Sequence, residues 1–230
     1  MNPESIDIVP YQKQDYEAVC KLLVESFKAK FQALVTLEDQ DIQQLLMKVW
    51  LQAPNPSTMK QFVVKENAEV VGVLCLKWKS PSSPLPATKK SISWTPLIKQ
   101  FGCFNVFKFL TGMHALDYKP AADECYIDHL AIHSSHRNQG IGRRFLAFAQ
   151  QFTVDSGFHV LTLHVANKNQ GAIHLYHKLA FEIEQSKYNY LRHFWFKEPV
   201  WHLMSWKGTK LHSRREHHCQ PSRVGHSEDR

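Results

Sequence analysis

A short basic loop with two glycines, lying between a strand-like run and a helix-like run, is the part of this sequence best suited to chemistry. Residues 130–144 read LAIHSSHRNQGIGRR. The first N–H groups of a helix lack partners within it, and the helix dipole adds partial positive charge there. Gly140 and Gly142 would let an anion approach the backbone without a Cβ in the way, and Arg137 and Arg143 could add charged donors. The segment therefore predicts a binding site for a phosphate or diphosphate group.

Other nucleotide-binding motifs do not fit this spacing. A dinucleotide fingerprint needs GxGxxG, whereas the pattern here is only GxG, and the GxxxxGK[ST] of a P-loop is absent. Plain packing of a loop against a helix also explains many glycine pairs, so the pair alone does not identify a ligand.

Two blocks of the sequence together resemble the GNAT superfamily of N-acetyltransferases. Arg137-x-x-Gly140-x-Gly142 resembles the family's R/Q-x-x-G-x-G/A, and residues 130–132 (LAI) resemble the L-x-V/I that precedes it. Residues 169–181 (NQGAIHLYHKLAF) resemble the family's N-x-x-A-x-x-L-Y-x-K-x-G-F. Two motifs at this separation identify the chain far better than either one alone.

The sequence departs from the family's pattern at two positions. Ala180 stands where glycine is usual, which leaves a left-handed helix end to a residue with a Cβ. Ser134 stands where proline is frequent. Neither departure affects the predicted anion site.

The resemblance implies that acetyl-coenzyme A is the co-substrate. Its pantetheine arm would lie beside the strand like a short extra strand, hydrogen-bonded to the backbone of Leu130, Ala131 and Ile132. Asn169 is expected to cap the next helix and to contact the cofactor as well. The diphosphate would bind the loop and the start of the following helix, at Arg137, Asn138, Gln139, Gly140, Ile141, Gly142 and Arg143.

Tyr176 is the general acid that the resemblance implies, and it would protonate the thiolate of the departing coenzyme A. A phenol with an ordinary pKa near ~10 suits this step. A tyrosine on the apolar face of a helix could instead serve packing alone.

Asp128 and Glu124 are the candidates for the base that takes a proton from the amine. Strict alternation along the strand places them on one face together with Tyr126, Leu130 and Ile132. Burial there is expected to raise a carboxyl pKa, which suits a base. Either carboxylate could instead be structural or could orient the substrate.

The predicted function is N-acetyl transfer from acetyl-coenzyme A to a primary amine of a small molecule or peptide, by direct attack in a ternary complex. No cysteine stands at a motif position, so a covalent acyl-enzyme is not expected. Carboxylates near the cleft would suit a cationic acceptor such as a polyamine, an aminoglycoside or a lysine side chain. Two other classes stay open: a regulatory protein that binds acetyl-coenzyme A without turnover and, ranked last, a nucleic-acid-binding protein.

Composition agrees with a globular protein that works in the cytoplasm. The 230 residues are 43% hydrophobic and 21% charged, and the net charge of +7 would suit a polyanionic cofactor. No secretory signal, membrane span or nucleic-acid-binding signature is apparent. Five scattered cysteines without a CxxC pair favour reduced thiols, and the histidines lack metal-ligand spacing, so no metal is expected. A homodimer is compatible with the sequence, although no pattern encodes one.

A mixed α/β fold is expected to position these residues, with a mostly antiparallel sheet and helices on both faces. Residues 1–207 would form one domain, and residues 208–230 a polar, disordered tail. Residues 80–120 would be an insertion between the third and fourth strands, beginning with a loop at 80–86. Its aromatic helix could pack in the core, cover the acceptor site, contact a second subunit or rest on a membrane. Strands are expected near 6–9, 61–65, 69–78, 124–132, 160–165, 181–190 and 200–207, and helices near 16–27, 37–51, 94–110, 141–152 and 169–179.

Overall fold

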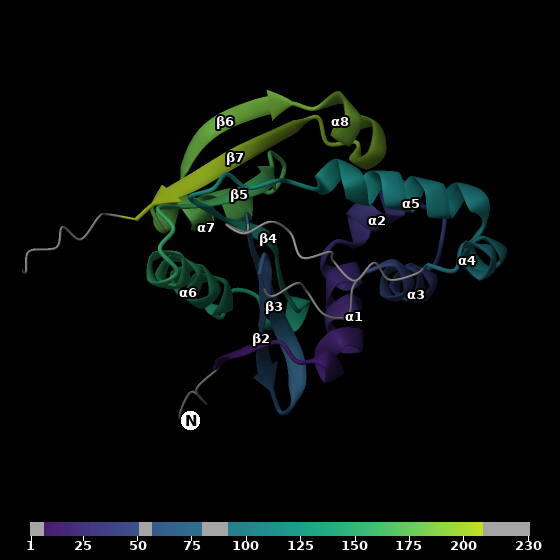
Figure 1. Ribbon diagram of the computed structural model, residues 1–230, viewed down its shortest axis with the longest axis horizontal. Coiled ribbons are helices and arrows are strands. Elements are labelled where there is room, and N and C mark those ends of the chain that lie inside the picture. Colours follow the sequence, from purple (N-terminus) through teal and green to yellow (C-terminus); the bar gives the residue numbers. More distant parts are fainter. Residues whose placement is uncertain (1–6, 51–56, 80–91, 209–230) are drawn as a thin grey trace, which may run out of the picture.

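A seven-stranded sheet in the order β1-β2-β3-β4-β5-β7-β6 runs through the middle of the protein (Figure 1). The computed structural model describes residues 7–50, 57–79 and 92–208. Neighbouring strands are antiparallel except β4 and β5, which are parallel. The mixed, mostly antiparallel sheet expected from the sequence is therefore confirmed. The strands are β1 (Ile8–Pro10), β2 (Met59–Glu66), β3 (Glu69–Trp78), β4 (Glu124–Ile132), β5 (Val160–Ala166), β6 (Glu182–Tyr188) and β7 (Val200–Lys207).

Helices cover both faces of the sheet (Figure 1). α6 and α7 lie on one face, and α1 to α5 lie on the other. Each face has its own buried apolar cluster, as expected for a sheet whose two sides are both covered. The helices are α1 (Tyr16–Ser26), α2 (Lys28–Leu34), α3 (Asp39–Val49), α4 (Trp94–Phe101), α5 (Cys103–Leu116), α6 (Ile141–Asp155), α7 (Gln170–Lys178) and α8 (Tyr190–Phe196), with 3-10 turns at Lys13–Asp15 and Ser134–His136.

The inserted segment forms two helices where the sequence pattern predicts one. Gly102 separates α4 from α5, and its φ of 79° breaks the helical backbone. Phe101 and Phe109 are buried in the core, whereas Phe104 is 81% exposed. The aromatic stripe is therefore divided between core and surface. The predicted loop at 80–86 lies outside the described residues.

The sequence pattern does not predict two of the helices. α2 follows α1 after a break at Phe27, and α8 lies between β6 and β7, where the sequence analysis assigns no element. α8 turns Arg192 and Phe196 inward and leaves Tyr190 and Phe194 exposed. The predicted tail lies, apart from Gly208, outside the described residues.

A β-bulge at Asp128 interrupts the pairing of β3 with β4. Leu76 pairs with Ile127 and Cys75 pairs with His129, so no β3 residue is left opposite Asp128. An extra residue of this kind bends the strand and shifts the side-chain alternation by one.

Because of the bulge, the prediction that these alternate residues of β4 all lie on one face of the sheet is wrong. Ala131 packs in the cluster on the α1 side of the sheet, whereas Leu130 and Ile132 pack in the cluster on the α6 side. Leu130 and Ile132 are therefore on the opposite face from Tyr126, which borders the α1-side cavity described below. Glu124, before the bulge, keeps the alternation of Tyr126.

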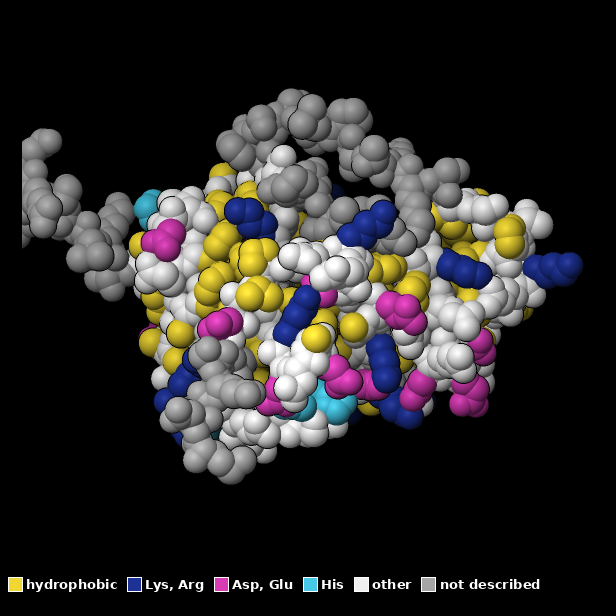
Figure 2. All heavy atoms as spheres, turned by 90° about the horizontal axis from the view of Figure 1, so that it is seen from below, with side chains coloured by type: hydrophobic (Ala, Val, Ile, Leu, Met, Phe, Trp, Pro, Cys, Tyr) yellow, Lys and Arg dark blue, Asp and Glu magenta, His cyan; other side chains and the backbone are white. Residues whose placement is uncertain are grey.

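Charged side chains of both signs are interspersed on the face seen in Figure 2, among apolar ones. The coloured residues of that face form no continuous basic stripe. Within the described parts of the chain, no helix has the length and apolarity needed to span a membrane.

Candidate functional site

β4 and β5 part from each other within the sheet, and a cavity lies where they separate. The two strands pair only from Glu124 and Val160 to Ile127 and Leu163. Beyond that point β4 continues beside β3, and β5 continues beside β7. The cavity has a volume of about 400 Å³ and is bordered by both strands, by β7 and by helices from both the N-terminal half and the C-terminal half.

The residues predicted to hold the pantetheine arm lie in the unpaired part of β4. Leu130, Ala131 and Ile132 pair with β3 on one side and face the gap toward β5 on the other. Backbone groups on that side are available to an extended ligand, in the way that a sheet edge accepts an added strand.

The loop between β4 and α6 has the backbone conformation of an anion-binding turn. Asn138 and Gly140 are both left-handed, with φ values of 62° and 85°. Such turns direct successive N–H groups toward one point. α6 begins at Ile141 with no side-chain cap, so its first N–H groups have no hydrogen-bond partner among the described residues.

Side chains of this loop are held by its own backbone. Arg137 donates from Nε to the carbonyl oxygen of Ile132 at 3.2 Å, and Gln139 donates from Nε2 to that of Ser135 at 2.9 Å. Arg143 is exposed on the first turn of α6. Arg137 therefore joins the end of β4 to the loop, and Arg143 is left open to solvent and ligand.

Gly140 and Gly142 are glycines for different physical reasons. A Cβ on Gly142 would lie 3.2 Å from Leu175 Cδ2 and 3.3 Å from Ile132 Cδ1, so Gly142 lets α6 pack closely on β4 and α7. A Cβ on Gly140 would meet nothing within 4 Å, and this residue is glycine because of its φ. Only Gly140 borders open space.

Tyr176 and Asn169 lie at the α7 end of the same cavity. Burial raises the pKa of Tyr176 to about 12, so the phenol keeps its proton throughout the neutral range. The side-chain oxygen of Asn169 accepts a hydrogen bond from the Ala172 N–H at 3.3 Å, as expected for an N-cap. Ala180, at the end of α7, is left-handed with a φ of 60° despite its Cβ.

Asp128 borders the cavity from the bulge. Its Oδ2 lies 3.1 Å from His129 Nδ1, and its Oδ1 lies 4.0 Å from Lys77 Nζ. Burial acts to raise the pKa of Asp128, but the hydrogen bond with His129 and the charges of His129 and Lys77 outweigh it, and the net direction is downward. The raised pKa expected from the sequence is therefore wrong, and Asp128 is ionised at neutral pH.

Glu124 is buried behind the site, and its carboxylate already accepts several hydrogen bonds. It receives hydrogen bonds from the Thr162 hydroxyl, from the Ala121 N–H at 2.7 Å and from the Tyr118 hydroxyl at 3.3 Å. Glu124 does not line the cavity. Its surroundings are those of a structural carboxylate, and Asp128 is the better placed of the two candidates for contact with an amine.

Cys75, Asp128 and His129 bring three possible metal-ligand atoms within 4.8 Å of one another. The sequence expectation of no metal site did not consider this group, because its members come from two strands. Burial raises the pKa of the Cys75 thiol well above its usual value, which favours the neutral thiol over the thiolate that binds metals. The carboxylate of Asp128 is paired with His129 instead.

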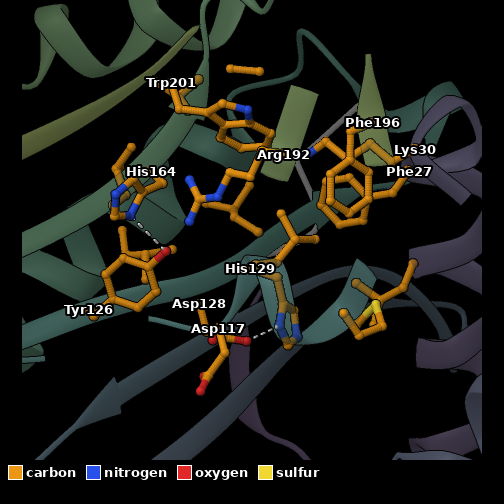
Figure 3. Close-up of a pocket in the computed structure, with 18 of the residues that line it drawn as sticks. Phe27, Lys30, Asp117, Tyr126, Asp128, His129, His164, Arg192, Phe196 and Trp201 are labelled. Atoms are coloured by element: carbon orange, nitrogen blue, oxygen red, sulfur yellow. Dashed lines mark hydrogen bonds and ion pairs between the residues drawn. The ribbon is translucent and has the colours of Figure 1, made fainter. Parts of the chain in front are cut away.

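Cations that the sequence analysis does not single out lie at the far end of the cavity (Figure 3). Arg192 of α8 and Lys30 of α2 both border it, close to the ring of Trp201. His164 lies beside them, and its Nδ1 is 3.2 Å from the Tyr126 hydroxyl. Arg192 and Lys30 come from the two helices that the pattern does not predict, so nothing in the linear sequence connects them with the motif residues.

Comparison with known proteins identifies the family. The model of the acetyltransferase (GNAT) family matches residues 16–181, and the chain belongs to that family. Over 72 residues the chain is 33% identical to the streptothricin acetyltransferase of Streptomyces lavendulae, a match that covers 31% of this chain and 38% of that protein. The chain thus spans well under half the length of this curated relative.

Solved structures show the same fold. The PaiA N-acetyltransferase of Thermoplasma acidophilum, in complex with coenzyme A, has a TM-score of 0.55 at 13% identity, covering 89% of this chain and 100% of that one. The IAA acetyltransferase of Bacillus cereus has a TM-score of 0.51 at 14% identity, covering 88% and 99%. At these identities the likeness is one of fold.

Proposed function

We propose that this member of the acetyltransferase (GNAT) family transfers the acetyl group of acetyl-coenzyme A to a primary amine, by direct attack in a ternary complex. The observation that carries the proposal is the unpaired edge of β4, which ends in the left-handed turn at Gly140 and borders, at Asp128 to Leu130, the cavity that also contains Tyr176. One neighbour in fold binds coenzyme A, and a relative in sequence is named as an acetyltransferase. Both support coenzyme A as the ligand.

The turn, the edge of β4 and the start of α7 each offer groups that suit one part of acetyl-coenzyme A. The left-handed turn at Asn138 and Gly140 and the free N–H groups of α6 would bind the diphosphate, with Arg143 adding charge. The gap-facing backbone of Leu130 and Ile132 would bind the pantetheine arm. Asn169 would contact the arm from the start of α7, where it also serves as cap.

Asp128 is proposed to bind the amine as its ammonium form and to receive its proton. Its low pKa keeps it ionised, so it attracts and orients the cation. The ammonium first gives one proton to this carboxylate, which releases it to solvent, and the neutral nitrogen then attacks the thioester carbonyl to form the C–N bond. The nitrogen gives its second proton to solvent as the tetrahedral intermediate collapses and the C–S bond breaks. Backbone N–H groups of β4 that face the gap would stabilise the oxyanion.

Tyr176 is proposed to give its phenolic proton to sulfur as the C–S bond breaks. A pKa of about 12 makes it a weak acid, but it holds its proton until a strongly basic thiolate develops. The phenol is then reprotonated from solvent before the next turnover. No chemistry is assigned to Cys75 or Cys125, which are fully buried and have raised pKa values.

Two measurements test the proposal. Calorimetry at low salt should show saturable binding of acetyl-coenzyme A, and a panel of amines should release free coenzyme A in the presence of the protein. Labelled acetyl-coenzyme A, mixed with the protein before any amine, should leave no acetyl group on the chain. Binding without turnover on any amine would favour the regulatory alternative, and labelled protein would contradict direct attack.

A further inference from the structure

Arg192 is a buried cation to which the described part of the chain offers no anionic partner. Its side chain is 7% exposed, and Nε donates to the Ala115 carbonyl oxygen at 3.1 Å. The guanidinium lies 4.8 Å from the centre of the Trp201 ring. Among the described residues no carboxylate pairs with it, and its terminal nitrogens have no acceptor. Those nitrogens lie toward the cavity, between Trp201 and the pair formed by Tyr126 and His164 (Figure 3).

Lys30 places a second cation at the same end. Its Nζ lies 4.9 Å from the Trp201 ring centre and 4.8 Å from that of Phe27. It makes no ion pair with any residue of the described chain. Glu198, the acid close enough to influence it, pairs with Lys168 at 3.4 Å instead. Two cations around one indole ring repel each other, and burying Arg192 without an anion beside the partly exposed Lys30 costs free energy.

The opposite end of the cavity carries negative charge. Asp128 and Asp117 both border it there, apart from Arg192 (Figure 3). Lys77 bridges these two carboxylates and neutralises only part of their charge. Many of the other residues that line the cavity are apolar, among them Leu23, Phe27, Phe31, Met113, Leu116 and Phe196.

We propose that the acceptor is an amine that also carries a carboxylate, an amino-acid-like zwitterion with an apolar body, whose carboxylate binds Arg192 and Lys30 while its amine faces Asp128. A guanidinium in a dry site binds a carboxylate through two parallel hydrogen bonds. A polyamine would instead place a second positive charge next to Arg192, so the cationic acceptor expected from the sequence is disfavoured. The diphosphate of coenzyme A is not the missing anion, because the Gly140 turn lies outside this cavity.

The inference rests on the proposed function and is tested by matched acceptors. Coenzyme A release is measured with apolar amino acids in which the amine and carboxylate are adjacent or further apart. Each is compared with its carboxamide and with the corresponding amine that lacks the carboxylate. The expected result is a kcat/KM at least about tenfold higher for the best carboxylate than for its two counterparts, as for one charge-assisted hydrogen-bonded pair.

Substitutions separate specificity from folding. Arg192→Gln should reduce that preference by about ten- to a hundredfold, while kcat/KM for the plain amine and the affinity for acetyl-coenzyme A stay within about twofold. Because Arg192 also holds α8 through Ala115, Lys30→Gln on α2 is the second variant, and it should reduce the same preference. Lys207→Gln, which removes a 72% exposed cation on β7, is the control and should leave the preference unchanged.

Different results would refute the zwitterionic acceptor and the proposed acetyltransferase function. Efficient acetylation of plain amines with no advantage for any carboxylate, in the unmodified protein, would overturn the zwitterion inference alone. Equal loss for carboxylate and plain amine in both variants would also overturn it. If no amine is acetylated, the proposed function fails, and binding is then read as the rise in melting temperature given by N-acetyl amino acids. That rise should vanish in Arg192→Gln, and its absence in the unmodified protein would refute the carboxylate site.

Discussion

Gly140→Ala, compared with Gly157→Ala, isolates the contribution of the loop to coenzyme A binding. The two glycines stand just before and just after α6, with φ values of 85° and 79°. A Cβ on either one would meet nothing within 4 Å. An alanine in the left-handed region costs about 1–2 kcal/mol at either position. For a domain of this size, such a loss lowers the melting temperature by about 2–8 °C.

Only one of the two positions should affect the cofactor. At Gly140 the new Cβ would stand in open space next to the first turn of α6, where the diphosphate is proposed to lie. Loss of one charge-assisted hydrogen bond, worth about 1.5–3 kcal/mol, weakens binding about ten- to a hundredfold. At Gly157 the change lies at the other end of the helix, and affinity should be unaltered.

The assay is calorimetric titration of acetyl-coenzyme A at low salt, with thermal melts of both variants. The expected pattern is a similar loss of melting temperature in the two proteins and weaker binding in Gly140→Ala alone. Equal affinities would show that the diphosphate does not approach the Gly140 turn. A much larger loss of stability in Gly140→Ala would instead show that packing, and not ligand approach, requires glycine there.

The remaining predictions concern side chains in the cavity and behind it. Tyr176→Phe should lower kcat at least about tenfold with little change in acetyl-coenzyme A affinity, and unchanged turnover would remove it from the mechanism. Asp128→Asn should lower kcat/KM by about tenfold or more in the folded protein, whereas Glu124→Gln should lower the free energy of unfolding by about 1–3 kcal/mol, seen in urea melts, with activity intact in the folded fraction. Burial, together with the charge of Arg192, lowers the pKa of Lys30 to about 8. Lys30 is therefore protonated below that pH, and kcat/KM for a carboxylate acceptor relative to a plain amine should fall as pH rises through about 8. In Lys30→Gln that ratio should not change with pH. Above about pH 8 the folded chain has lost the Lys30 proton while the unfolded chain still holds it. The contribution of Lys30 to the free energy of unfolding should therefore rise with pH above about 8.

The order of the strands along the chain and the backbone conformation of the motif loop could be predicted because their signals are local. The strand, loop and helix from Leu130 to Arg143 are continuous in sequence, and the φ of Gly140 is a requirement that a single residue type reveals. Asn169 and Tyr176 lie on one short helix with recognisable spacing. For such segments the residue types themselves report the backbone conformation.

The chemistry of Asp128 could not be predicted, because its partners lie on other strands. Alternation along β4 gives no warning of a bulge, since the extra residue is visible only as a change in pairing with β3. The bulge also brings Asp128 close to Lys77, whose charge helps to reverse the direction of the pKa shift. The side chain of Asp128 is also 29% exposed, so the prediction failed both at the neighbours and at the burial.

The acceptor end differs from the cofactor end in what its specificity depends on. Coenzyme A is proposed to be held mainly by backbone groups of β4 and α6, which side-chain changes alter little. The proposed carboxylate site depends on side chains from α2 and α8, and α8 is a seven-residue helix between β6 and β7. The main contacts of α8 are with the helices α2 and α5. Substitutions at Arg192 should therefore change which amine is accepted without changing the affinity for acetyl-coenzyme A. Joint loss of acceptor preference and cofactor affinity in Arg192→Gln would show that the two ends are a single cooperative unit.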